Sequence, residues 1–133
     1  MATTAPAPTA RPSARRAAHP GRRWLLVGSL MVLIGSFLPW IDTAVGSVSG
    51  MAGAGLWTFY ACMLGFAGVL VPSQRLAAVQ AALLAVVAVG LTGWQVGHVL
   101  NLVGTAGWMP GSGLVVVFLG GVVSAICAVR LAR

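Results

Sequence analysis

Charged residues are almost missing from one long stretch of this chain, and that stretch decides its fold class. Between Trp24 and Leu131 the formal charges are Asp42, Arg75 and Arg130. Of the 133 residues, 59% are hydrophobic and 7% are charged, which is too apolar for a surface that faces water. We therefore expect an all-α protein that crosses the plasma membrane several times and has no separate soluble domain.

Four apolar runs follow a basic N-terminal segment. A membrane-spanning helix needs about 20 apolar residues, and the second run is somewhat short for that length. Residues 1–23 hold four prolines and five arginines, which predicts a disordered cytoplasmic tail. Residues 24–133 should form the transmembrane domain. Trp24 and Trp40, at the ends of the first run, are typical of side chains at the lipid headgroup level. The expected helices cover about 24–41, 56–71, 76–102 and 114–131.

The basic residues are all arginines, and they fall on one side of the expected membrane. Arg75 lies between the second and third runs, and Arg130 and Arg133 end the fourth. The two other loops contain none, so the positive-inside rule predicts that both termini are cytoplasmic. A tail of this kind is expected to bind anionic lipid or a partner protein rather than nucleic acid. Its arginines are Arg11, Arg15, Arg16, Arg22 and Arg23.

An export signal is the alternative interpretation of the N-terminus. Arg22 and Arg23 before the first apolar run resemble a twin-arginine signal, and Ala44 and Gly46 could flank a cleavage point. The exported part would itself consist of three apolar runs, so we favour a retained first helix.

An internal repeat is visible when the chain is shifted by 58 positions. The shift places Val45–Leu56 on Val103–Leu114, and six of the twelve positions are identical. The chain then predicts two tandem parallel-repeat hairpins, related by an axis along the membrane normal. Low complexity is the alternative explanation. Each copy carries a Gly-x-Gly-Leu sequence, where we expect glycines with positive φ and close packing of helix on loop.

Small residues recur at helical spacing on the third and fourth runs, where they would allow close helix packing in lipid. Gly93 and Gly97 share one face of the third run, and Gly120 and Ser124 share one face of the fourth. These faces either pack the four helices together or contact partner helices.

Residues that carry chemistry are scarce. The chain has no paired carboxylates, no metal-binding cluster and no nucleophile with a base, so we expect neither an enzyme nor a bound metal or cofactor. Cys62 and Cys127 should lie at different depths, which argues against a disulfide. The outer ends of the helices could bring Asp42 near His98, in a pair that handles protons or a quinone. The alternative is that both residues are simply hydrated at the interface. Haem is not expected, because the second histidine lies in the tail.

Known families of four short spans do not fit these residues. Small multidrug resistance exporters resemble one another in a membrane-embedded Glu, and this chain contains no Glu. Fluoride channels need balanced charge on the two sides. The tripeptide Gly55–Trp57 resembles that of claudins, but the flanking Trp and loop cysteines are missing. The sequence Phe37–Trp40, a Gly/Ser-rich loop and then Gly53–Gly55 is similar to uncharacterised small four-helix membrane proteins of actinobacteria, a resemblance that implies no activity.

The leading functional hypothesis is a non-catalytic accessory subunit of a larger membrane complex, either respiratory or part of cell-envelope synthesis. Its partners would be larger integral membrane proteins, and self-association into a homo-oligomer stays open. The first alternative is a small transporter or channel along the repeat axis. The second is a quinone- or proton-handling subunit that uses Asp42 and His98.

Overall fold

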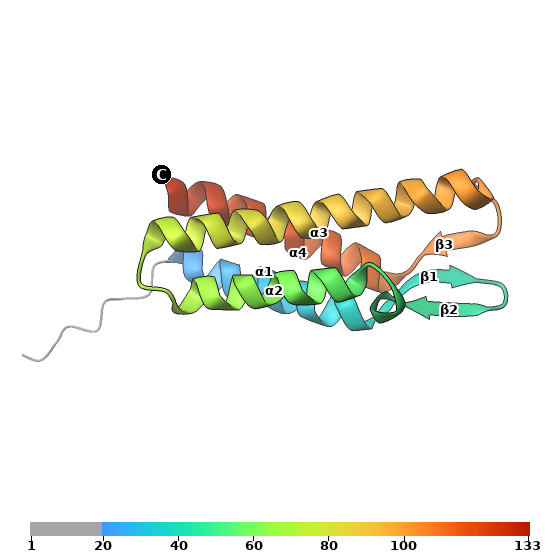
Figure 1. Ribbon diagram of the computed structural model, residues 1–133, viewed down its shortest axis with the longest axis horizontal. Helices are drawn as coiled ribbons and strands as arrows, with labels where there is room; N and C mark the ends of the chain where they lie inside the picture. Colours follow the sequence, from blue (N-terminus) through green and yellow to red (C-terminus); the bar gives the residue numbers. More distant parts are fainter. Residues whose placement is uncertain (1–19) are drawn as a thin grey trace, which may run out of the picture.

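The computed structural model describes residues 20–133, which form four helices and one small sheet (Figure 1). The expected tail residues Arg11, Arg15 and Arg16 lie outside the described part of the chain. The helices are α1 (Pro20–Phe37), α2 (Gly55–Leu70), α3 (Gln74–Val103) and α4 (Ser112–Ala132). The strands are β1 (Pro39–Thr43), β2 (Gly46–Ser49) and β3 (Trp108–Pro110), and a short 3₁₀ turn, η1, covers Gly50–Ala52.

The four helices form an elongated antiparallel bundle (Figure 1). Each helix packs mainly against two others: α1 and α3 both contact α2 and α4, and they barely touch one another. The sheet lies at one end of the bundle, whereas the C-terminus and the start of α1 lie at the other. This up-and-down order follows from short connections, which leave consecutive helices as antiparallel neighbours.

Two of the helices are long and apolar enough to cross a membrane. These are α3, with 30 residues, and α4, with 21 residues. The apolar α2 is shorter, with 16 residues. In α1, which has 18 residues, Arg22 and Arg23 lower the mean hydropathy. The helices α2, α3 and α4 begin and end within two residues of the bounds expected from the sequence.

The expectation for the first helix is wrong at both ends. The helix α1 begins at Pro20, inside the expected tail, and it ends at Phe37 rather than near residue 41. Pro39 explains the early end, because proline has no N–H for a helical hydrogen bond and disfavours helical dihedral angles in the preceding residue. The chain continues as β1.

The α1–α2 and α3–α4 connections form a sheet, so the all-α expectation is also wrong there. The strand β1 lies in the middle and pairs antiparallel with both β2 and β3. On one side Asp42 faces Ser47, and on the other it faces Met109. The sheet therefore joins the α1–α2 connection to the α3–α4 connection.

The position of Trp40 in the sequence suggested an interfacial side chain, but Trp40 is buried instead. It is 2% exposed, and its indole Nε1 donates a hydrogen bond of 2.9 Å to the carbonyl oxygen of Gly35. Gly50 packs directly against the indole ring, where a side chain would have no room. Its N–H donates to the Leu38 carbonyl oxygen at 3.1 Å. Trp40 thus fills the sheet end of the bundle.

The Gly-x-Gly sequences before α2 and α4 serve close packing rather than unusual backbone angles. The positive-φ glycines are Gly46, Gly104 and Gly107, all outside these sequences. A Cβ atom on Gly113 would lie 2.7 Å from the carbonyl oxygen of Gly35, and one on Gly55 would lie 2.5 Å from the backbone of Gly50. The predicted positive φ is therefore wrong at these positions, and the predicted helix-to-loop packing is present.

The two halves share a helix–loop–helix outline and differ in detail. Gly46 and Gly104, which the 58-residue shift superimposes, both have positive φ. Residues 97–101, however, are helical, whereas their counterparts 39–43 form β1. The strand β3 likewise corresponds to the turn η1. The internal repeat remains a prediction.

Apolar side chains and satisfied hydroxyl groups fill the interior. Leu25, Val32, Leu84 and Val117 are fully buried. The buried hydroxyls of Ser29, Ser36, Thr92 and Ser124 each donate to the carbonyl oxygen four residues earlier in the same helix. Ser36 also shares a hydrogen bond of 2.8 Å with Thr58, which links α1 to α2.

Candidate functional site

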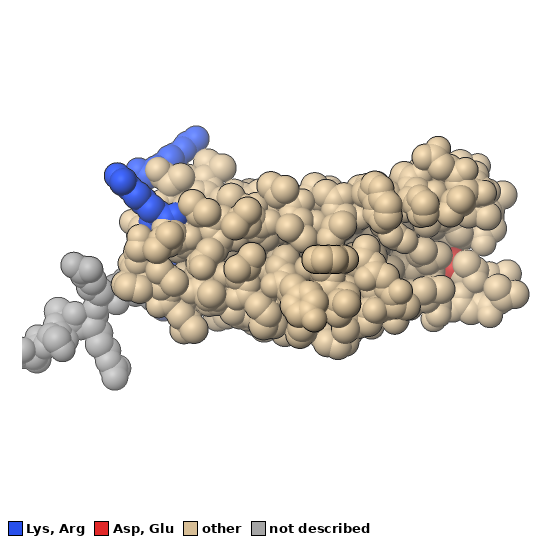
Figure 2. All heavy atoms as spheres, in the orientation of Figure 1, with Lys and Arg blue, Asp and Glu red and all other residues tan. Residues whose placement is uncertain are grey.

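Charge is separated between the two ends of the bundle. Figure 2 shows arginine side chains gathered at the end opposite the sheet, and the single acidic residue, Asp42, at the sheet end. The surface between them is apolar: large hydrophobic side chains are exposed on all four helices, with Ile34 at 55% and Val86 at 70%. The described arginines are Arg22, Arg23, Arg75, Arg130 and Arg133.

Asp42 and His98 line separate hollows. Asp42 lies on β1 beside Trp108 and Pro110. His98 lies on α3, where its ring stacks on that of Trp94 with 5.1 Å between ring centroids. No hydrogen bond or ion pair joins the two among residues 20–133, and the described residues contain no group of three metal-ligating side chains. The described structure therefore shows no direct contact between Asp42 and His98, and their joint role in handling protons or a quinone stays a prediction.

The two cysteines lie inside the helical bundle as free thiols. Cys62 is on α2, where its thiol donates to the Phe59 carbonyl oxygen. Cys127 is on α4 and is 2% exposed. Both side chains belong to the apolar core, as their small size permits.

The small residues of α4 are used inside the chain. A Cβ atom on Gly120 would lie 2.9 Å from the carbonyl oxygen of Gly28, and one on Gly28 would lie 2.6 Å from the Ser124 hydroxyl. Gly120 and Ser124 therefore bring α4 into close contact with α1. This is the kind of contact through which helices associate in lipid.

The small residues of α3 have different surroundings. A Cβ atom on Gly93 or Gly97 would meet nothing within 4 Å, and the same is true of Gly90 one turn earlier. Gly90 and Gly93 are exposed and Gly97 is half-buried, and all three follow one stripe of α3 next to Trp94, which is 60% exposed. We call this surface the open glycine face (Gly90, Gly93, Gly97 and Trp94). Packing within the chain does not require glycine at any of its three positions.

A hollow of about 600 Å³ borders the open glycine face between α3 and the start of α2. Two indole rings, those of Trp57 and Trp94, line it, and Gln95 and His98 add polar groups. No sequence pattern indicates that Trp57 and Trp94 line one hollow, because they are far apart in the chain and are brought together only by the packing of α2 on α3.

No family model, curated protein or solved structure matches this chain. The features that bear on function are the geometry of the bundle, its charged ends and the open glycine face.

Proposed function

We propose that the chain crosses a plasma membrane four times, with both termini in the cytoplasm, and acts as a non-catalytic accessory subunit of a larger membrane complex. The arginine end would face the cytoplasm and the sheet end the outside. The opposite placement of Arg and Asp in Figure 2 supports this orientation, since basic residues remain on the cytoplasmic side. The composition resembles that of small actinobacterial membrane proteins, so we propose such a cell as the source.

Helix lengths are compatible with this placement. At about 1.5 Å per residue, α3 covers roughly 30 Å between Arg75 and Trp94, which equals the thickness of the hydrocarbon core. Trp94 would lie at the outer headgroups and Trp24 at the inner ones, where indole rings are enriched. His98 would then lie outside the hydrocarbon. The shorter α2, about 24 Å long, can be accommodated by local thinning of the bilayer.

The open glycine face is the observation that carries the accessory role. A glycine in a helix interior is less favourable than alanine by up to about 1 kcal/mol, so three unpacked glycines on one face weaken α3 without benefit to the isolated chain. Glycine on an outward helix face lets a second backbone approach closely in lipid. We therefore assign this face to a helix of a partner membrane protein, and the adjoining hollow to one of its bulky side chains.

The test combines two variants of α3 with purification of the tagged protein from its own membranes. Gly93→Leu with Gly97→Leu should abolish recovery of the stoichiometric partner in mild detergent, measured by mass spectrometry of co-migrating proteins. The control, Val79→Leu, changes an exposed residue in the cytoplasmic half of the same helix and should leave recovery unchanged. If the unaltered protein is recovered only as a monomer or homo-oligomer, the proposal is wrong.

The alternative functions have less support. A transporter along the bundle axis would need a polar path, but the axis is filled by Leu25, Val32, Leu84 and Val117. The buried hydroxyls form hydrogen bonds within the bundle. A proton- or quinone-handling role would need Asp42 and His98 in one site.

A further inference from the structure

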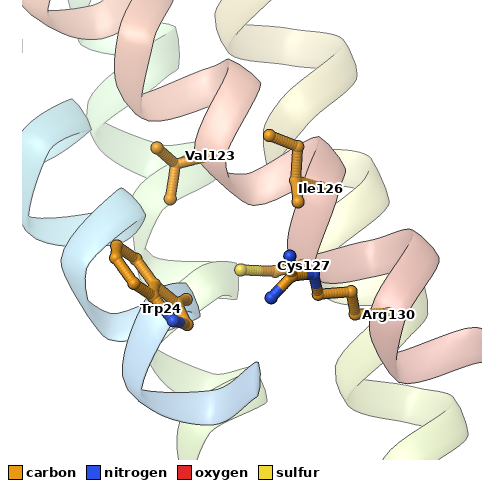
Figure 3. Close-up of a pocket in the computed structure, with 5 residues that line it drawn as sticks. All are labelled: Trp24, Val123, Ile126, Cys127 and Arg130. Carbon is orange, nitrogen blue, oxygen red and sulfur yellow. The ribbon is translucent and has the colours of Figure 1, made fainter. Parts of the chain in front are cut away.

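A hollow opens between α1 and α4 at the arginine end of the bundle (Figure 3). Its volume is about 200 Å³. Figure 3 shows the Cys127 side chain pointing from α4 toward Trp24 of α1, with the Arg130 side chain lying back over the same opening. The result is an apolar recess with a guanidinium group at its edge. The lining residues are Trp24, Val123, Ile126, Cys127 and Arg130.

The walls of this recess are open to the surroundings, while its floor belongs to the core. Cys127 is 2% exposed and packs with the buried core residues. Trp24 and Ile126, in contrast, are 54% and 51% exposed. A molecule in the recess would therefore contact core atoms on one side and remain continuous with the lipid on the other.

The charge of Arg130 has no acidic counterpart in the sequence near this end. Asp42 is the only acidic residue of the whole chain, and it lies at the opposite end (Figure 2). Arg22, by comparison, donates to the carbonyl oxygen of Pro72 at 2.9 Å. No acidic side chain near this end is therefore available to Arg130, and a phosphate group fits the planar guanidinium well.

We infer that this recess binds an anionic phospholipid of the cytoplasmic leaflet. The lipid phosphate accepts hydrogen bonds from Arg130, and one acyl chain lies along Ile126 and Cys127 beside the Trp24 ring. Basic recesses between helices on the cytoplasmic side are typical sites for anionic lipid headgroups. The inference rests on the proposed membrane placement, and it does not depend on a partner protein.

The headgroup contact can be tested on the purified chain alone. Native mass spectrometry in detergent should show one phosphatidylglycerol molecule retained, in preference to phosphatidylcholine. Arg130→Gln should weaken that retention about fivefold or more, since one arginine near an anionic headgroup contributes at least this factor. Arg130→Lys, which keeps the charge, should retain most of it. Arg133→Gln is the matched control, because it removes the same charge one turn away, outside the recess.

The acyl contact is tested separately. Ile126→Trp should reduce retention by filling the recess, whereas Val129→Trp, a similarly exposed position outside it, should not. Inorganic phosphate at millimolar concentration should fail to displace the lipid, because it lacks the acyl chain.

Three results would overturn the inference: equal loss with Arg130→Gln and Arg133→Gln, equal retention of phosphatidylcholine, or displacement by phosphate alone. Since these measurements use the isolated chain, their failure is distinct from a failure to find a protein partner.

Discussion

The glycines of α3 and those of α4 have opposite surroundings. Glycine-to-alanine substitutions, which add one methyl group, test this difference. A Cβ atom on Gly120 would meet the Gly28 carbonyl oxygen at 2.9 Å, so Gly120→Ala should lower the free energy of unfolding by about 1–3 kcal/mol. Gly93→Ala meets open space and should leave it unchanged or raise it by up to about 1 kcal/mol. Unfolding of both variants in the same detergent measures the difference. Equal destabilisation would contradict the proposed packing of α4 on α1.

Trp40 should be among the most sensitive single side chains. Trp40→Ala removes a fully enclosed ring and should destabilise the fold by about 3–5 kcal/mol. Trp40→Phe keeps most of the ring but loses the hydrogen bond to Gly35, which contributes about 1 kcal/mol. Thermal unfolding of the two variants in detergent separates the loss of ring packing from the loss of the hydrogen bond. The control is Trp94→Phe, because Trp94 is exposed and should tolerate the change. A mild effect of Trp40→Ala would mean that Trp40 is not enclosed.

The sequence indicated which residues are important for packing more readily than it indicated what they contact. The small residues of α3 and α4 stood out by spacing, but spacing could not tell that Gly120 packs on Gly28 while Gly93 faces outward. Trp40 was misplaced because its position at the end of an apolar run is typical of an interfacial tryptophan. The fold of the loops that follow decides its burial, and this information is not local.

At the scale of the helices, the hydrogen bond between Ser36 and Thr58 is the polar link between α1 and α2. A double-mutant cycle of Ser36→Ala and Thr58→Ala should give a coupling energy of about 0.6 kcal/mol, as is usual for helix-to-helix hydrogen bonds in membrane proteins. Ser29→Ala is the control partner, because the Ser29 hydroxyl bonds only within α1. A coupling of zero for the first pair would show that the two hydroxyls do not interact in detergent.

The elements themselves were predictable to different degrees. Hydropathy located α2, α3 and α4 because their apolar runs end at turns rich in glycine, proline or polar residues. It extended α1 too far, since Leu38, Trp40 and Ile41 are as apolar as a helix interior and only Pro39 indicated the break. No sequence pattern predicted the sheet. Gly46–Ser49 has few strand-forming residues, and β3 pairs with β1 across about half of the chain.

For the whole molecule, the proposed orientation predicts which loops react from outside the cell. Val45→Cys lies in the β1–β2 turn and is 99% exposed as Val, so a membrane-impermeant maleimide should label it in intact cells. Ser73→Cys, between α2 and α3, should be labelled only after the membrane is opened. The native Cys62 and Cys127 are buried and should give little background. If only Ser73→Cys is labelled in intact cells, the proposed orientation is wrong and the opposite one holds.

The candidate sites could be predicted only in part at this scale. The sequence predicts that the arginines share one side of the molecule, because that prediction needs only the order of the apolar runs and of the charges. The recess at Arg130 depends on how α1 lies against α4, and no periodicity within either helix records that contact.

The central position of β1 has a consequence for biosynthesis. Under the proposed topology, β1 and β2 reach the outer side early, while β3 is made only after α2 and α3 have entered the membrane. At ~5–20 residues per second, the ribosome needs several seconds to supply the intervening chain. During this interval the β1 edge that later pairs with β3 is unpaired, and such an edge can bind another strand. Addition of β3 covers this edge, so the sheet is complete only at the last stage of translation, with β2 and β3 as its edge strands.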